Sequence, residues 1–99
     1  MEIAEYAAWA ARIARVSPDA TPDRERLAYL GLGLTGEAGE VAELIKKLLR
    51  DGVWSPDQLG DELGDVFYYL AALCVASGHQ PGDLLAASRA KIEARLKAR

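Results

Sequence analysis

The chain has 99 residues and a mass of 10.7 kDa, so it can form one small domain with a modest core. Eighteen residues are alanine and none is asparagine, a balance that favours helices over sheets. The net charge of −3 and the isoelectric point of about 5.1 exclude the basic face that a nucleic-acid platform needs.

Four helices are predicted from hydrophobic periodicity, separated by prolines and glycines. Their expected ranges are 2–15, 22–50, 56–77 and 83–97. Thr21 is the predicted N-cap of the second helix, with Pro22 at its first position. The third is predicted to begin with a capping box at Ser55 and to end at Gly78. We therefore expect an all-α, four-helix bundle-like domain over residues 1–99, with two long central helices in a hairpin and two flanking helices.

The cysteine content and the lack of a long apolar run indicate the cellular compartment of such a domain. Cys74 is the single cysteine, so no intrachain disulfide can form, and its apolar surroundings predict a core position. No run of about 18 apolar residues is present for a membrane span, and the N-terminus shows no signal peptide. We expect a soluble, cytoplasmic protein. We also expect it to oligomerise, because an alanine-rich chain of this size builds only a thin core.

Four glycines lie inside the second predicted helix, at positions 31, 33, 36 and 39. Each costs about 1 kcal/mol relative to alanine in a helix interior. Such a concentration predicts a kink or a close backbone contact in this helix.

Two pairs of carboxylates stand at helical spacing, Glu37 with Glu40 and Glu62 with Asp65. Residues i and i+3 are neighbours on a helix surface, so each pair offers two adjacent carboxylates. Each acid comes one residue before a position of the apolar seam, which places both pairs at its rim, about 100° from its centre. A hairpin staggered by about one turn would bring all four together.

Four converging carboxylates repel one another unless cations neutralise them. Oxygen ligands without histidine or thiol suit Mg²⁺ or Mn²⁺ and not zinc. A ferritin-like di-iron site would need a glutamate and a histidine at i and i+3, and the sequence contains no such pair. The alternative is that these are solvated helix acids paired with lysines, as Glu43 and Lys47 are expected to be.

Basic residues complete a possible polyphosphate site. Lys47 lies on nearly the same helix face as Glu40, and Lys91 and Arg95 are one turn apart on the last helix. The alternative for Lys91 and Arg95 is a helix end stabilised by the macrodipole. Tyr69, four residues after Asp65, either stacks on a base or packs in the bundle.

These motifs resemble the MazG-like nucleoside triphosphate pyrophosphohydrolases of the all-α NTP pyrophosphatase superfamily. The similarity covers about residues 27–95 and rests on the stretch from Gly31 to Glu43 and on Glu62-Leu63-Gly64-Asp65. The family signature is Glu-x-x-Glu, a variable gap and Glu-x-x-Asp, and here 21 residues separate Glu40 from Glu62.

The resemblance implies cleavage of an NTP or dNTP to the monophosphate and pyrophosphate, by a homodimer or a dimer of dimers. It implies Mg²⁺, with Mn²⁺ as a substitute, held by four ligands: Glu37, Glu40, Glu62 and Asp65. Glu37 or Glu40 would take the proton from water, and the substrate would contact Lys47, Tyr69, Lys91 and Arg95. The last two match the basic members of a family pattern, Asn-x-x-Lys-x-x-x-Arg, in which Ser88 replaces the asparagine.

Two other functions stay open. A phosphoribosyl-ATP pyrophosphatase usually has a histidine at the position of Tyr69 and a Glu-Glu run in the first motif, and neither is present. A non-catalytic helical dimer could bind a nucleotide or a partner protein through the same face.

Overall fold

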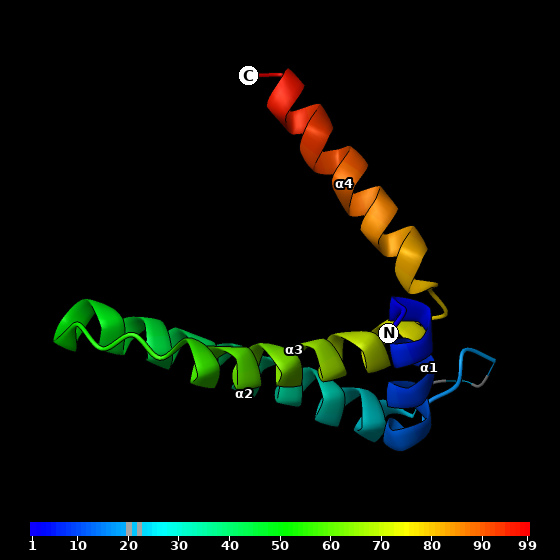
Figure 1. Ribbon diagram of the computed structural model, residues 1–99. Helices are drawn as coiled ribbons and strands as arrows, with labels where there is room; N and C mark the ends of the chain where they lie inside the picture. Colours follow the sequence, from blue (N-terminus) through cyan, green and yellow to red (C-terminus); the bar gives the residue numbers. More distant parts are fainter. Residues whose placement is uncertain (20, 22) are drawn as a thin grey trace.

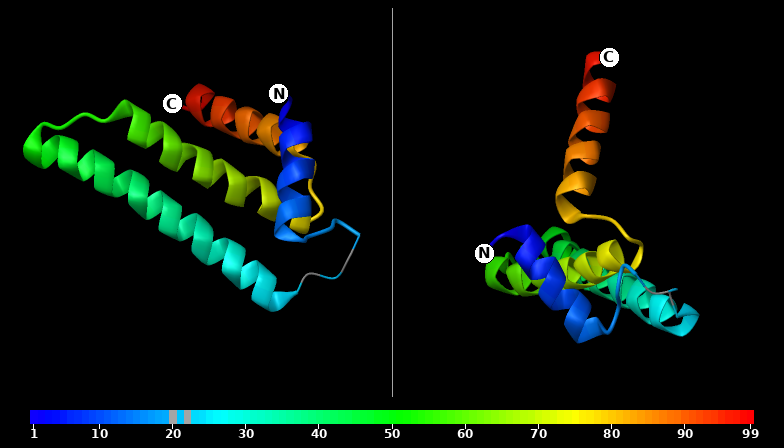
Figure 2. Two further views of the ribbon diagram at one scale, coloured as in Figure 1. Left: turned by 60° about the horizontal axis from the view of Figure 1, so that its bottom comes forward. Right: turned by 90° about the vertical axis from the view of Figure 1, so that its right-hand side faces the viewer.

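The computed structural model describes residues 1–19, 21 and 23–99. It contains four α-helices: α1 (Ile3–Ala14), α2 (Arg24–Asp51), α3 (Pro56–Ala76) and α4 (Pro81–Lys97). No strand occurs in these ranges, which confirms the predicted all-α fold. α2 and α3 form a long antiparallel hairpin, α1 crosses it near the end of α3, and α4 projects away from it (Figures 1 and 2).

The start of α2 differs from the prediction. Asp23 is its N-cap, and the Asp23 carboxylate accepts a hydrogen bond of 3.0 Å from the Glu25 amide. The helix therefore begins at Arg24, and the prediction of Thr21 as the cap was wrong. Aspartate is as good an N-cap as threonine, so the sequence offered two competing starts. The predicted first residue, Pro22, lies outside the described residues.

The starts of α3 and α4 also differ in detail from the prediction. Pro56 opens α3 as expected, but the Ser55 side chain makes no capping hydrogen bond. The predicted capping box is therefore absent. α4 begins at Pro81, two residues before Asp83. Proline suits the first turn of a helix, where its missing N–H costs nothing.

α3 is the central helix of the fold. α1 and α2 both pack on α3 and do not contact each other in the described part of the chain. The buried core centres on Ala14, Leu30 and Ala72, with Tyr68 and Tyr69 partly buried against it. Apart from Leu30 and Cys74, every buried residue that the structure describes is an alanine. The core is thin, as the composition predicted, and the core position of Cys74 is confirmed.

One of the α2 glycines explains how closely the hairpin packs. α2 is a single helix of 28 residues, and a Cβ atom added at Gly33 would overlap the ring of Tyr69 on α3. This is the close contact that the glycine-rich stretch predicted. The space beside Gly31, Gly36 and Gly39 is open, so these three glycines are not required by packing within this chain.

None of the helices in the described ranges combines the length and the hydropathy that a membrane span requires.

Candidate metal centre

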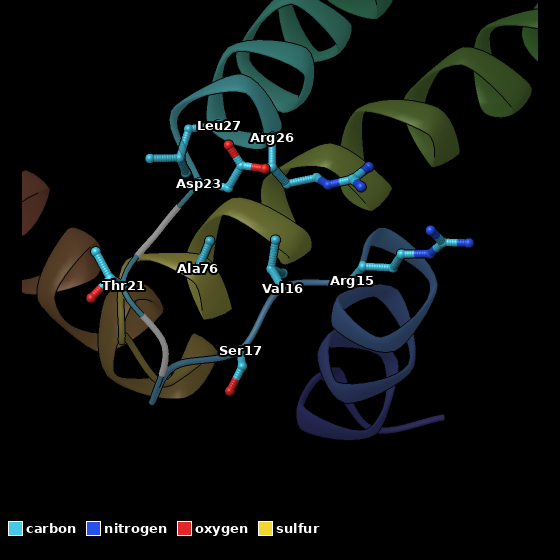
Figure 3. A pocket seen from close by; sticks show the side chains of 8 residues that line it. All are labelled: Arg15, Val16, Ser17, Thr21, Asp23, Arg26, Leu27 and Ala76. Atoms are coloured by element: carbon cyan, nitrogen blue, oxygen red, sulfur yellow. The ribbon is translucent and has the colours of Figure 1, made fainter.

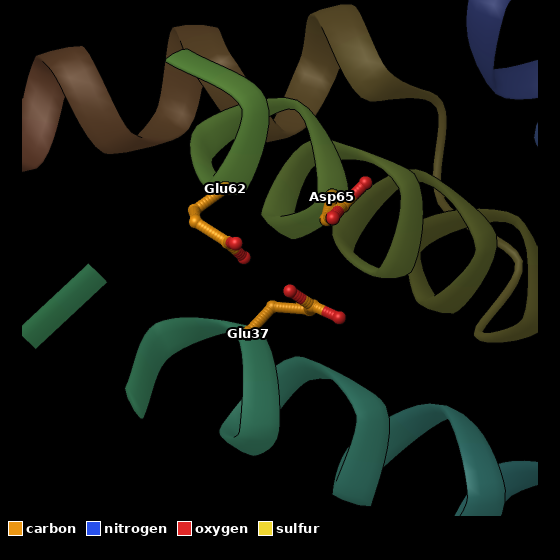
Figure 4. A group of neighbouring side chains, drawn as sticks. All are labelled: Glu37, Glu62 and Asp65. Carbon is orange, nitrogen blue, oxygen red and sulfur yellow. The ribbon is translucent and has the colours of Figure 1, made fainter. Parts of the chain in front are cut away.

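Three carboxylates from the two long helices meet across the hairpin. Glu37 comes from α2, and Glu62 and Asp65 come from α3 (Figure 4). One oxygen atom from each of the three lies within 4.8 Å of the others. Glu37 and Glu62 are half-buried, and Asp65 is exposed. The arrangement presents converging oxygen atoms at the side of the hairpin.

The helical period explains which acids point inward. On α2, Glu37 lies in the row that also holds Leu30, Leu34 and Val41, at spacings of three and four residues. On α3, Glu62 occupies the same kind of position between Leu59 and Val66, which are also half-buried. In each acidic pair, one carboxylate thus occupies a position in the helix–helix contact whose neighbouring positions hold apolar residues.

The expectation that both pairs stand at the rim of the seam was therefore right for only one acid of each pair. The predicted seam of this helix runs through Leu27, Leu34, Val41 and Leu48, joined by Leu30, Leu44 and Ile45. Glu37 lies one heptad after Leu30, within about 20° of it around the helix, which brings Glu37 into the contact. Glu40 and Asp65 stay at the rim and are exposed.

The proximity of the three acids changes the ionisation of Glu37. A hydrogen bond between Glu37 and Glu62, partial desolvation and the charges of Asp65, Glu62 and Glu40 raise the pKa of Glu37 to about 7. None of the ion pairs found in the described ranges involves these carboxylates. The cluster therefore has excess negative charge and no protein cation to balance it.

Glu40 lies outside the group of three. It lines a polar hollow on the same side of the hairpin, together with Lys47, Gln58, Asp61 and Glu62. Lys47 thus borders the acidic cluster, as the sequence predicted. The expected pair of Glu43 with Lys47 was wrong, because Glu43 bonds to Lys46 at 3.2 Å. Spacings of i+3 and i+4 are both in reach on a helix.

The donor set fits a hard divalent cation. All donors are carboxylate oxygens, the ligands that Mg²⁺ and Mn²⁺ prefer. The softer donors lie elsewhere: the Cys74 thiol donates to the His79 carbonyl at 3.3 Å, and His79 Nδ1 pairs with the Ser77 hydroxyl at 2.8 Å. The residues present would therefore hold magnesium or manganese in preference to zinc.

Of the other predicted substrate residues, Tyr69 lies near the acidic cluster, since the charge of Glu37 adds to burial in raising the Tyr69 pKa, whereas Lys91 and Arg95 lie on another helix. Tyr69 packs against Gly33 and the core, and burial raises its pKa. Tyr69 is thus half-buried against the core, and its contact with a substrate stays a prediction. Lys91 and Arg95 are exposed on α4, which contacts α1 and α3 but not α2 in the described residues.

Two aromatic residues of α1 carried no functional signal in the sequence. Tyr6 and Trp9 of α1 begin a row of rings that continues through Tyr68 to Tyr69, with centroid distances of 5.6, 6.1 and 5.1 Å. Burial and the nearby charge of Asp65 raise the pKa of Tyr6. The spacing of Tyr6 and Trp9 at i and i+3 predicts that both rings lie on one face of their helix. It does not predict which other helix that face packs against.

A second hollow lies at the connection between α1 and α2 (Figure 3). Arg15 and Arg26 line it, and their guanidinium groups extend away from Thr21. Its single carboxylate, Asp23, already caps α2. This hollow therefore offers no metal ligand set.

A helical hairpin that directs carboxylates from both long helices to one point defines an all-α protein with a candidate cation site. Residues 26–99 match the model of the MazG nucleotide pyrophosphohydrolase domain. The chain belongs to this family, and α1 lies outside the matched residues.

One curated relative gives a closer comparison. The Gene 37 protein of Mycobacterium phage L5 is 52% identical over 54 residues, which are 50% of this chain and 47% of that protein. The match thus spans about half of each chain. No solved structure matches this chain.

Proposed function

We propose that this protein is a metal-dependent nucleoside triphosphate pyrophosphohydrolase. It would convert an NTP or dNTP and water to the monophosphate and pyrophosphate, and so remove unwanted nucleotides. The convergence of Glu37, Glu62 and Asp65 without a balancing cation, in a chain of the MazG family, carries this proposal.

The acids divide into two roles. Glu37, Glu62 and Asp65 would hold Mg²⁺ or Mn²⁺, and Glu40 lines the adjoining hollow. The bound ion would neutralise phosphate oxygens and stabilise the leaving pyrophosphate. Glu40 is exposed and stands outside the group of three, so it is the better candidate to accept the proton of the attacking water.

The reaction would break the bond between the α-phosphorus and the oxygen that bridges to the β-phosphorus. Water attacks the α-phosphorus, its proton passes to the general base, and the electron pair of the broken bond leaves with pyrophosphate. Lys47, beside Glu40 in the polar hollow, would bind phosphate oxygens as a mobile point charge.

We further propose that the chain works as a homodimer or a dimer of dimers. Large apolar side chains are exposed along the hairpin, with Leu32 at 73%, Leu49 at 82% and Phe67 at 58% of their full accessibility. The buried residues, in contrast, are mostly alanines. A second copy of the chain would bury exposed apolar side chains of this kind.

The test is pyrophosphate release from a panel of NTPs, dNTPs and phosphoribosyl-ATP in the presence of Mg²⁺. We expect turnover of NTPs or dNTPs that EDTA abolishes. In Asp65→Asn, turnover should fall by orders of magnitude, whereas the matched control Asp57→Asn on the same helix should retain it. Preference for phosphoribosyl-ATP would favour the alternative of a phosphoribosyl-ATP pyrophosphatase. Nucleotide binding without any turnover would favour a non-catalytic dimer.

A further inference from the structure

Two arginines line the hollow between the end of α1 and the start of α2 (Figure 3). Arg15 directly follows the last residue of α1, and Arg26 lies in the first turn of α2. Both guanidinium groups extend to the same side of the hollow, away from Thr21. The hollow has a volume of about 140 Å³ and spans only a few water molecules. One small ligand can therefore contact both side chains.

Arg26 begins the row of α2 that packs against α3. It lies four residues before Leu30, which is 1% exposed, and this row continues through Leu34 to Glu37. Arg26 is itself half-buried. A guanidinium group stays charged in such a place, and its five N–H donors require acceptors.

Neither arginine has an anionic partner in the part of the chain that the structure describes. The three ion pairs found there involve other cations, namely Lys46, Arg50 and Arg89. The carboxylate that lines the hollow, Asp23, accepts a hydrogen bond from the Glu25 amide instead. The hollow therefore has two positive charges against one negative charge.

The backbone of Arg15 adopts the left-handed conformation, with a φ of 59°. Glycine is the usual residue at such a helix end, because a Cβ atom makes this conformation less favourable. The other positive φ values in the described residues belong to Gly52 and Gly78. The chain thus keeps a cation beside the hollow at a position where glycine would fit with less strain.

The hollow is separate from the candidate metal centre. Arg26 precedes Glu37 by eleven residues on α2, which is about 16 Å along the helix axis. Between them, the ring of Tyr69 packs against Gly33. The arginines therefore form a second charged site, opposite in sign to the acidic cluster.

We propose that Arg15 and Arg26 bind a phosphate-type anion between their guanidinium groups. The planar guanidinium group binds phosphate oxygens through paired, charge-assisted hydrogen bonds. The anion is either free, as orthophosphate or pyrophosphate, or it is the phosphate group of a nucleotide. It would link α1 to α2, two helices that make no contact with each other in the described residues, and so stabilise the folded state.

The test is a titration followed by NMR spectroscopy of the backbone amides, in EDTA so that no cation occupies the acidic cluster. Sodium phosphate is added at constant ionic strength, with sodium chloride as the reference salt. We expect saturable shifts of the amides of Arg15, Val16, Arg26 and Leu27, with a Kd of about 1 mM or tighter. Parallel titrations distinguish the two sources. Tighter binding of pyrophosphate would identify a free anion, and tighter binding of adenosine monophosphate would identify a nucleotide phosphate.

The variant Arg15→Gly/Arg26→Gln removes both cations. Glycine relieves the left-handed conformation and glutamine keeps helix propensity, so the variant should fold. Its Kd for phosphate should rise at least about tenfold. The matched control is Arg12→Gln/Arg24→Gln, which removes the same charge from the same two helices at positions that do not line the hollow. This control should bind phosphate as the wild type does.

Absence of saturable shifts up to about 20 mM phosphate would overturn the proposal. Equal loss of binding in both double variants would do the same, because it would indicate general attraction by net charge. Arg15→Gly alone leaves α2 unchanged and repeats the test if the double variant fails to fold. None of these measurements uses turnover, so their outcome is independent of the proposed pyrophosphohydrolase activity.

Discussion

The ring of Tyr69 on α3 occupies the space in which a Cβ atom of Gly33 on α2 would lie. The hairpin therefore depends on a glycine at this position, four residues before Glu37. The contact fixes how closely the two long helices approach beside the acidic cluster.

We expect Gly33→Ala to destabilise the protein by about 1–3 kcal/mol, because the added methyl group must displace a packed ring. The control is Gly31→Ala in the same helix, where the space is open. That change should stabilise the protein by up to about 1 kcal/mol through helix propensity. Urea denaturation of both variants measures the two effects, and equal effects would contradict the close contact.

The stability of the metal-free protein should depend on the ionisation of Glu37. Its pKa is raised from 4.5 to about 7 in the folded state, so the folded state binds more protons than the unfolded state between these values. The free energy of unfolding should therefore rise as the pH falls from above 7 towards 4.5. Glu37→Gln should remove this dependence. Glu25→Gln, at the start of α2, should preserve it, as urea denaturation in EDTA at several pH values can show.

Mg²⁺ should raise the thermal stability of the protein by binding the folded state alone. At a concentration of about 100 times Kd, the stabilisation of a single site is about 2.7 kcal/mol. Glu62→Gln should lose most of this increase, since it removes one converging carboxylate. In contrast, its metal-free form should be more stable than wild type because less like charge is gathered. An unchanged response to Mg²⁺ in calorimetry would remove Glu62 from the site.

Two helix starts should respond differently to loss of their capping side chains. Asp23→Ala removes a hydrogen bond to the Glu25 amide and should cost about 0.5–2 kcal/mol. Ser55→Ala removes a hydroxyl that makes no capping hydrogen bond, so its cost should be within about 0.5 kcal/mol. Urea denaturation compares the two, and a large effect at Ser55 would show that its hydroxyl caps α3 in solution.

Much of this architecture is readable from local sequence. Gly52, Pro56 and Gly78 mark helix ends by restricting or permitting backbone angles, and both acidic pairs follow from helical spacing alone. The choice between Thr21 and Asp23 as the cap was not readable, because both side chains can accept the same kind of hydrogen bond.

The assembly of the site depends on relations between helices, which local sequence does not contain. The stagger of the hairpin decides that Glu37 meets Glu62 and Asp65 while Glu40 faces the neighbouring hollow. The orientation of α4 could not be predicted from the sequence either. Its large apolar residues predict a helix that packs against another surface, but they do not identify that surface.

The short connection between α2 and α3 also has a consequence for the order of folding. Residues 52–55 join the two helices, so their first contacts form between residues that are close in sequence, at a small cost in loop entropy. Pairing that proceeds from this loop reaches Glu37 and Glu62 before it reaches Leu30 and Ala72 in the core. A cation bound to the half-formed hairpin would thus act as part of the folding nucleus, and Mg²⁺ would speed folding more than it slows unfolding.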